Sequence, residues 1–520
     1  MATKAGIEAT LLAFGDLSHG QCAIKPGGNA YAVEPAVVEE AVNSGLLEKR
    51  VVRLTGGFDF FVALMSNGET WSWGHNKFGQ LGMGDTADLH VPRPIEFMQT
   101  VTVGQVACGF AHTLFLSTAG DVYLCGSNSN GQLGLEEVTD DDNPAIKPGS
   151  AHFSAPLQSP IAELKSKTVA IAAGHYFSLF LLADGSLYSC GSSAYGQLGH
   201  GSNVGRKKPH RLSYFLSQSV QVKAIAAGYY HALALSTDNV LYAWGHSGDG
   251  RLGLGSHSGE VQLPREVRLT GSHEHETCEE AAEIVQLAAG RAHSAAVTKG
   301  GKLWIWGEGA AGQLGGGSSE NAWEPRNCAE LANYDVAQVF CGDKHTILLS
   351  KSGQCLGAGA GNFGQLGMGL TIARSLKFQL IPQLQSSFVA TAAVAGRSTI
   401  VLAVTNEGDG WYDLTLPVVQ ARPPRSALQA GDEGAGDSES VQALRAELQE
   451  LKGTVVTLKE ELREAIQQSS PSPMAAMATG LSPTQDGMAS PENFAVLLQT
   501  VRQLQEEMSQ LKSGQAAPVG

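Results

Sequence analysis

The sequence predicts an all-β fold: a seven-bladed β-propeller of four-stranded blades, followed by a mostly disordered tail with two coiled-coil-type helices. Three observations support this prediction. A glycine-rich loop of fixed spacing recurs seven times, a second glycine motif recurs in phase with it, and the composition changes over the last 100 residues. Seven copies at a period of about 50 residues indicate repeated architecture, because a ligand-binding loop occurs once or twice in a chain.

The glycine loop is clearest in WSWGHNKFGQLGMG, from Trp71 to Gly84, where four residues separate Gly74 from Gly79. A phosphate-binding P-loop has this spacing, but it needs Lys and then Ser or Thr after the second glycine. Gln80 and Leu81 stand there instead, so we interpret the loop as structural. The second glycines of the seven copies are Gly20, Gly79, Gly131, Gly196, Gly250, Gly312 and Gly364. The intervals between them are 59, 52, 65, 54, 62 and 52 residues.

The second motif is Gly, two residues, often His, and then an apolar run. Its copies begin at Gly57, Gly109, Gly174, Gly228, Gly290, Gly342 and Gly396. The apolar run reads as a strand, and a turn and an aromatic strand follow it. Another β-branched stretch precedes each copy. Each unit thus supplies about four short strands, as a propeller blade does.

The fourth position of this motif holds a histidine in four copies and Phe60 or Phe177 in two others. A metal-binding or catalytic ring would not tolerate Phe there, so we predict buried, hydrogen-bonded structural histidines. The four histidines are His112, His231, His293 and His345.

The chain ends suggest how the propeller closes. Thr10 to Phe14 is an aromatic strand, and Thr399 to Val404 is the strand that precedes an aromatic strand in the other units. Pairing them would complete one blade and remove an open sheet edge. Trp411 to Leu416 is a second candidate for the closing strand.

Tryptophans mark the aromatic strands, and we expect them to pack between blades. They are Trp71, Trp73, Trp244, Trp304 and Trp306. Cys125 and Cys190 take the tryptophan position in two copies, while Cys108 and Cys341 replace Ala before the motif glycine. The eight cysteines form no CxxC pair, so we interpret them as small core residues in a reducing compartment.

The paired elements G-x4-GQLG and G-x-x-H, at this period, resemble the regulator of chromosome condensation repeat family. The resemblance covers roughly residues 9 to 405. It implies a seven-bladed β-propeller. Members of the family serve as exchange factors for Ran-type GTPases, as chromatin binders, as the plant ultraviolet-B receptor and as adaptor domains. The resemblance therefore implies the fold but does not select the function.

Three of these functions are disfavoured by the residues. The photoreceptor repeats GWRHT-type motifs, whereas no G-x-x-H motif here carries Trp. In the founding exchange factor one glycine loop departs from the standard form and wedges into the GTPase, whereas all seven loops here keep the spacing. The net charge of −15 leaves about −10 on the propeller and −5 on residues 421–520, which disfavours nucleic acid.

We therefore expect a non-enzymatic protein-interaction scaffold without a cofactor, since no nucleophile–base or metal set stands apart from the repeat. The alternative is a guanine-nucleotide exchange factor for a Ran-like small GTPase. We find no signal peptide and no membrane-spanning stretch, so we expect an intracellular protein of the cytoplasm or nucleus.

Two insertions and one basic run are candidate sites. Glu136 to Pro144 is acidic. In Gly271 to Glu280, His273, His275 and Cys278 are candidate zinc ligands, but they lack a fourth ligand, and a solvated acidic loop is favoured. The basic run is a candidate for binding an acidic partner or phosphate, against the simpler reading of a solvated face. It comprises Arg206, Lys207, Lys208, His210 and Arg211.

The tail is expected to alternate linkers and helices after the propeller of residues 1–416. We predict a linker over 417–440, a coiled-coil helix over 441–467, a Ser/Pro-rich linker over 468–490, a second helix over 491–512 and disorder over 513–520. The apolar seams, at alternating steps of three and four, are Val441, Leu444, Leu448, Leu451, Val455, Leu458 and Leu462, then Phe494, Leu497, Val501, Leu504, Met508 and Leu511. Each apolar seam must be buried against another surface, and we expect self-association through the first seam, Val441 to Leu462. The alternatives are a helical hairpin or packing of the helices on the propeller.

Four Ser-Pro pairs in the second linker are possible phosphorylation sites.

Overall fold

The computed structural model describes residues 9–24, 31–135, 152–255, 259–269, 283–369 and 371–404. All of them belong to a compact unit spanning Met1–Ser426, and the second unit is Ala427–Gly520. The predicted tail helices with their seams, the linkers, the two acidic insertions and the zinc candidates His273, His275 and Cys278 lie outside the described residues.

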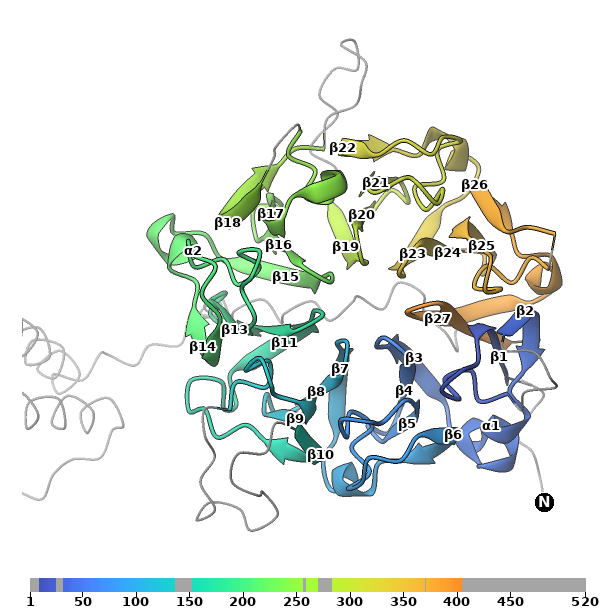
Figure 1. Cartoon of the computed structure of the whole chain (residues 1–520), viewed down its shortest axis with the longest axis horizontal. Helices are drawn as coiled ribbons and strands as arrows, with labels where there is room; N and C mark the ends of the chain where they lie inside the picture. Colours follow the sequence, from blue (N-terminus) through green and yellow to red (C-terminus); the bar gives the residue numbers. More distant parts are fainter. Residues whose placement is uncertain are drawn as a thin grey trace, which may run out of the picture. The chain divides into compact units, whose positions relative to one another are not determined.

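Seven four-stranded antiparallel sheets surround a central axis, as the repeats predict (Figure 1). Six sheets are formed by consecutive strands. These are β3 (Val51–Gly56), β4 (Phe60–Met65), β5 (Thr70–Gly74) and β6 (Leu89–Pro94); β7 (Val103–Cys108), β8 (His112–Ser117), β9 (Val122–Ser127) and β10 (His152–Gln158); β11 (Thr168–Ala173), β12 (Phe177–Leu182), β13 (Leu187–Gly191) and β14 (Arg206–Arg211); β15 (Val222–Ala227), β16 (His231–Ser236), β17 (Leu241–His246) and β18 (Glu260–Val267); β19 (Ile284–Ala289), β20 (His293–Thr298), β21 (Leu303–Gly307) and β22 (Ala322–Asn327); β23 (Val336–Cys341), β24 (His345–Ser350), β25 (Cys355–Ala360) and β26 (Arg374–Leu380).

The seventh blade joins the two ends of the described chain. It contains β1 (Ala9–Asp16), β2 (Tyr31–Val37), β27 (Phe388–Ala395) and β28 (Ser398–Val404), in the order β2-β1-β28-β27. β1 pairs with β28 from Ala9 opposite Val404 to Gly15 opposite Ser398. The predicted pairing of the first strand with Thr399 to Val404 is confirmed, and Trp411 to Leu416 lies outside the described residues.

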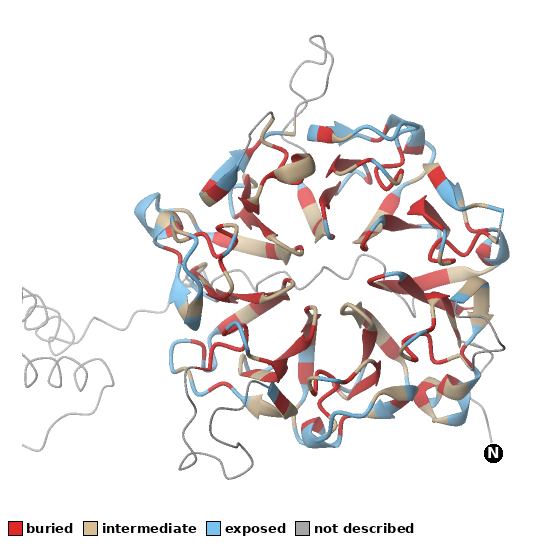
Figure 2. Cartoon of the chain, viewed as in Figure 1, coloured by how far each residue is buried: buried red, intermediate tan, exposed pale blue. Residues whose placement is uncertain are grey.

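Burial falls from the middle of each blade to its outer strand (Figure 2). The second strands are buried along their whole length, because both faces of each sheet pack against neighbouring blades. Their residues are accordingly apolar on both faces, as in the FSLFLL of β12. Short helices α1 (Glu39–Asn43) and α2 (Ser213–Ser217) lie in connections between blades. No described helix is long and apolar enough to cross a membrane.

Each glycine loop packs its blade against the next one. The second glycine of a loop lies against the outer strand of the following blade, and a Cβ on Gly79 would lie 2.4 Å from Ser154 Cα. Gly131 is also close-packed, since a Cβ on it would lie 2.7 Å from Lys207 Cα. Gln80 Oε1 accepts the backbone N–H of Phe78 and holds the turn. The glycines are therefore structural, and the P-loop alternative is excluded by packing as well as by sequence.

The four motif histidines are buried and hydrogen-bonded between blades, as predicted. His112 Nε2 lies 3.0 Å from Ser178 Oγ in the next blade, and that hydroxyl donates to the Gln132 carbonyl at 2.6 Å. His231, His293 and His345 contact Ser or Thr hydroxyls in the same way. Burial lowers the pKa of His112, His293 and His345 to about 3, so these imidazoles are neutral.

The aromatic strands also join neighbouring blades. Trp73, Trp244 and Trp306 are fully buried, and each indole N–H donates to a glycine-loop carbonyl of the preceding blade. Cys125 and Cys190 occupy the tryptophan position and direct their thiols at the equivalent carbonyls, at 3.5 and 3.6 Å. All cysteines among the described residues are free.

Candidate functional site

One side of the propeller carries both repeated motifs, and we call it the glycine-loop face. The first residue of a glycine loop donates its backbone N–H to the G-x-x-H turn of the same blade. His75 N donates to Asp59 O at 2.9 Å, and Ser127 N to Ala111 O at 2.7 Å. The second and third residues of the turns and the middle residues of the loops therefore share one surface.

The axis of the propeller holds a cavity of about 80 Å³, lined mainly by the backbone of the G-x-x-H turns. Gly57, Gly109, Gly174 and three of their equivalents leave no room for side chains there, because a Cβ on each would clash with the aromatic or histidine ring three residues later, and a Cβ on Gly396 would lie 2.3 Å from Phe58 O. This volume is far below the roughly 300–1,000 Å³ of small-molecule sites. The axis is therefore a poor small-molecule pocket.

Aromatic rings cover one half of the face around the axis. Phe58, Phe110, His175 and Tyr229 occupy the same position in four consecutive turns, and we call them the aromatic arc. Ring centroids are 4.6 Å apart for Phe58 and Phe110 and 4.3 Å for Phe110 and His175; His175 and Tyr229 stack at 4.9 Å. Burial lowers the pKa of His175 to about 4, so the arc is uncharged at neutral pH.

Further aromatic residues extend the arc outward between β13 and β22. Tyr195 contacts Tyr230 at 5.1 Å and His246 at 4.6 Å between ring centroids. Tyr195 and His246 also line a surface depression of about 240 Å³ whose rim includes Trp323. The Trp323 side chain is 42% exposed, which is unusual for so large an apolar group.

Charged residues occupy the same turn position in the other three copies. Arg291, Asp343 and Arg397 form this charged arc. Arg291 Nη1 lies 3.4 Å from Asp343 Oδ1, and the Arg397 guanidinium lies 4.5 Å from the Phe363 ring. Asp343 is buried, whereas both arginines are exposed. Burial raises the pKa of neighbouring Asp59 to about 6, although His19 and Arg397 oppose the shift.

The fifth glycine loop departs from the repeat, because Arg251 replaces the usual Gln. Its buried guanidinium contacts the Gly248 carbonyl, the Asp249 carboxylate and the Arg291 carbonyl. Asp249 adopts a positive φ of 61° beside it. Arg251 thus ties the loop to the turn that begins the charged arc.

The buried Ser–His contacts superficially resemble a nucleophile and its base. Ser178 Oγ donates to a carbonyl, so its lone pair accepts the proton on His112 Nε2. A histidine that donates this proton is not a base for the hydroxyl. Both side chains are fully buried, so no substrate reaches them. Among the described residues, these pairs support packing rather than catalysis.

The basic residues predicted as a partner site lie on the outer strand β14. Lys207, Lys208, His210 and Arg211 are exposed, and Arg206 is partly buried. β14 packs against the preceding glycine loop through Lys207 and Pro209. The structure therefore places this run on the rim, away from the two arcs. Lys and Pro on an edge strand also limit unwanted strand pairing.

The residues of the two arcs were missed in the sequence. Aligning the second position of all seven G-x-x-H motifs shows four aromatic or histidine residues followed by Arg, Asp and Arg. Also missed was a group with metal-ligand chemistry, His19, His75 and Asp88. The two histidines stand in adjacent copies of the glycine loop, but the path that brings Asp88 to them is not visible in the sequence.

Comparison with family models finds the RCC1-like domain over residues 147–412. Models of the regulator of chromosome condensation (RCC1) repeat match residues 67–116, 51–80 and 103–132.

Curated relatives are similar over most of the propeller. The Ultraviolet-B receptor UVR8 of Arabidopsis thaliana is 32% identical over 333 residues, 64% of this chain and 70% of that protein. Protein RCC2 of Homo sapiens is 30% identical, and the match covers 59% of this chain and 58% of RCC2. The E3 ubiquitin-protein ligase HERC2 of Homo sapiens is also 30% identical. This match covers 62% of this chain but only 6% of HERC2.

Solved structures share the fold at lower identity. Human WBSCR16 matches with a TM-score of 0.63 and 23% identity, covering 76% of this chain and 99% of that one. Yeast RCC1 (Prp20), solved with Kap60 bound, matches with a TM-score of 0.64 and 20% identity, covering 77% and 90%.

Proposed function

This chain belongs to the regulator of chromosome condensation repeat family, and we propose that it is a non-enzymatic protein-binding regulator that docks partners on its glycine-loop face. The observation that supports this proposal is the division of the face into an aromatic arc and a charged arc around the axis. Two solved structures of the same fold are consistent with such a role: yeast RCC1 (Prp20) bound to Kap60, and Prp20p of Saccharomyces cerevisiae, with its binding properties to Gsp1p and histones.

The chemistry of the face suits a protein segment better than a small ligand. Tyr, Trp and Arg are enriched at the energetic centres of protein interfaces. The aromatic arc is partly exposed and held rigid by ring contacts, so little conformational entropy is lost on docking. Exposed Arg291 and Arg397 would face acidic groups of the partner. We therefore propose a partner segment with an apolar anchor and a neighbouring carboxylate.

The proposal is tested with two charge-matched double variants of the full chain. Arg291→Glu with Arg397→Glu alters the face, and Lys207→Glu with Lys208→Glu makes the same charge change on β14. We expect quantitative affinity capture to show at least a tenfold loss of specific partners with the face variant and retention with the β14 variant. The reverse pattern would move the binding site to the basic strand β14, the second surface that we propose for an acidic partner.

Exchange-factor activity is the alternative function. Both glycines of every loop keep a positive φ, including those of the fifth loop, and this shared backbone does not favour a wedge. The test is nucleotide release from a panel of small GTPases, with the Arg251→Gln variant included because the fifth loop is the least standard one. Catalytic acceleration of release from any GTPase would overturn the scaffold proposal.

We also propose that the tail adds self-association through Val441 to Leu462, and that the protein works in the cytoplasm or nucleus. Sedimentation of the full chain and of a truncation at Pro417 at micromolar concentration tests the first point. If both sediment as monomers, self-association is wrong. Imaging of a tagged full-length chain tests the second, and secretion or an extracellular location would contradict it.

A further inference from the structure

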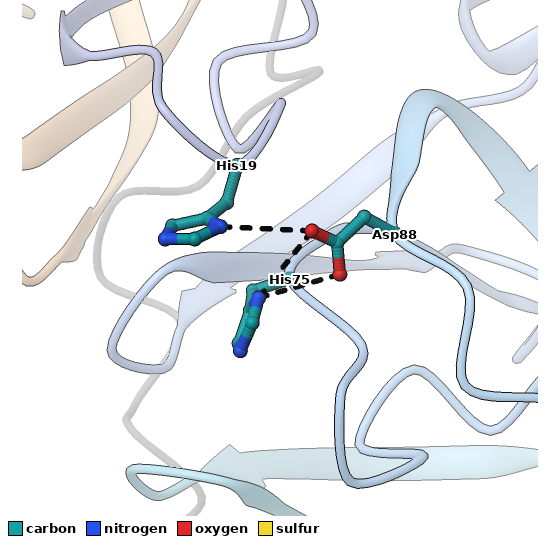
Figure 3. Close-up of side chains that lie close together, drawn as sticks. All are labelled: His19, His75 and Asp88. Carbon is teal, nitrogen blue, oxygen red and sulfur yellow. Dashed lines mark hydrogen bonds and ion pairs between the residues drawn. The ribbon is translucent and has the colours of Figure 1, made fainter.

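Three side chains with metal-ligand chemistry converge at the junction between the closing blade and the blade that follows it (Figure 3). His19 stands in the loop after β1, His75 directly follows β5, and Asp88 directly precedes β6. The two histidines thus come from different blades. Their side chains are 40% and 24% exposed and that of Asp88 is 32% exposed, so an ion could reach them from solvent.

The distances between the ligand atoms fit a shared metal ion. Oδ2 of Asp88 lies 3.4 Å from His75 Nδ1 and 3.6 Å from His19 Nδ1. Both distances are longer than most N–H···O hydrogen bonds, which are 2.7–3.2 Å long. Zinc ligands at about 2.0–2.2 Å in a tetrahedron are about 3.3–3.6 Å from one another. The ligand atoms of all three residues lie within 4.8 Å of one another, so a small rotation of an exposed side chain completes the set.

The backbone around the three side chains is held in place. Asp88 Oδ1 accepts the Asn76 N–H at 2.7 Å and also lies 3.3 Å from His75 Nδ1, while Oδ2 lies between the two histidines. His75 N donates to Asp59 O at 2.9 Å, and His19 N donates to Gln21 Oε1 at 2.8 Å. These two bonds fix the backbone positions of the histidines, while the bond to Asn76 orients the Asp88 carboxylate itself, as outer hydrogen bonds orient metal ligands.

The repeat architecture explains only part of this group. In the sixth glycine loop, Asn321 precedes β22 and accepts the Gly309 N–H at 3.0 Å, as Asp88 does for Asn76. The capping oxygen of Asp88 therefore belongs to the fold. The residue equivalent to His75 is Glu308, and the residue equivalent to His19, in the preceding loop, is Asp249, whose Oδ1 lies 3.5 Å from Asn321 Nδ2. Nothing in the repeat requires two histidines facing this carboxylate.

We propose that His19, His75 and Asp88 form a binding site for a divalent transition-metal ion, with Zn²⁺ as the best-suited ion. Two imidazole nitrogens and one carboxylate oxygen are suitable ligands for Zn²⁺ and unsuitable for Mg²⁺ or Ca²⁺, which prefer oxygen alone. Water completes the tetrahedron on the solvent side. The ion would join the closing blade to its neighbour at the point where the two ends of the ring meet.

The test uses the full chain freed of metal with a chelator and titrated with Zn²⁺ against a chromophoric competitor. Co²⁺ is added in parallel, because its visible absorption reports tetrahedral coordination. We expect about one equivalent of tight binding that millimolar Mg²⁺ does not displace. His19→Asn and His75→Asn should each weaken Zn²⁺ binding by at least about 100-fold, more than the loss of an outer hydrogen bond.

Two control variants make the assignment specific. His246→Asn removes the histidine that follows Gly245 as His75 follows Gly74, and the triple change His273→Asn, His275→Asn and Cys278→Ser removes the other candidate ligands. Both controls should bind Zn²⁺ like the unmodified chain. Equal thermal stability of all variants without metal excludes misfolding. Zinc binding unchanged in His19→Asn and His75→Asn, or no binding by the unmodified chain, would overturn the proposal.

Discussion

Gly79→Ala is the substitution that most directly tests whether the glycine loop is architecture. Gly79 has a φ of 78°, and an added Cβ would lie 2.4 Å from Ser154 Cα and 2.9 Å from Ser154 N in the next blade. The left-handed backbone costs about 1–2 kcal/mol for a non-glycine residue. The clash is with backbone, so the blades must separate, and such overpacking costs about 1–3 kcal/mol more. We expect a total loss of about 2–5 kcal/mol, and a larger loss for Gly79→Val.

Gly45→Ala is the matched control, because Gly45 has a φ of 81° and the nearest atom to its Cβ position is 3.7 Å away. It should show the backbone cost alone, about 1–2 kcal/mol. Urea unfolding followed by tryptophan fluorescence measures both variants at equal slope. Equal destabilisation by the two substitutions would refute the packing argument. A Gly79→Val protein with unchanged stability but a lost partner would show that the loop is a contact site instead.

The remaining predictions concern pH, the fifth loop and ring closure. The His112 pKa of about 3 lies below its unfolded value of about 6.5, so the unfolded state binds the proton first and stability falls as the pH drops from 6.5 toward 3. His112→Phe, which copies Phe60 and Phe177, should reduce the loss of unfolding free energy between pH 7.5 and 5.5 by about 1.4 kcal/mol. An unchanged loss in urea titrations would contradict a neutral buried imidazole. Arg251→Gln should stay within about 1 kcal/mol of the original stability, because six loops use Gln. Arg251→Ala should lose about 2–3 kcal/mol, because it leaves buried polar groups without a partner. Equal melting temperatures of the two variants would count against this role of Arg251. Deleting residues 1–16 removes β1 from between β2 and β28, and we expect a lower melting temperature with aggregation in light scattering; melting like the full chain would show that closure does not depend on β1.

The repeat made most of the fold predictable. Both glycines of each loop, the inter-blade tryptophans and the buried histidines follow from positions that recur in phase, so each copy supports the reading of the others. The pairing of β1 with β28 followed from the strand order within one unit. The choice between β28 and Trp411 to Leu416 needed coordinates, because both segments have strand-like sequences.

The candidate site was less predictable for a physical reason. Side chains on the glycine-loop face are free of the packing that fixes the glycines, so they vary from copy to copy and show no repeat. Their grouping into aromatic and charged arcs emerges only when the second positions of all seven motifs are compared, because neither arc is a repeated residue. The approach of Asp88 to His75 depends on the path of residues 82–88, which turn features alone do not determine.

Cross-linking mass spectrometry on a captured partner complex tests the central claim most directly. The reagent should join lysines, because exposed lysines lie on both competing surfaces. Lys77 and Lys344 lie on the glycine-loop face, and Lys207 and Lys208 lie on β14. We predict partner cross-links to Lys77 and Lys344, with recovery falling in the Arg291→Glu, Arg397→Glu variant. Cross-links confined to Lys207 and Lys208 would contradict docking on the glycine-loop face.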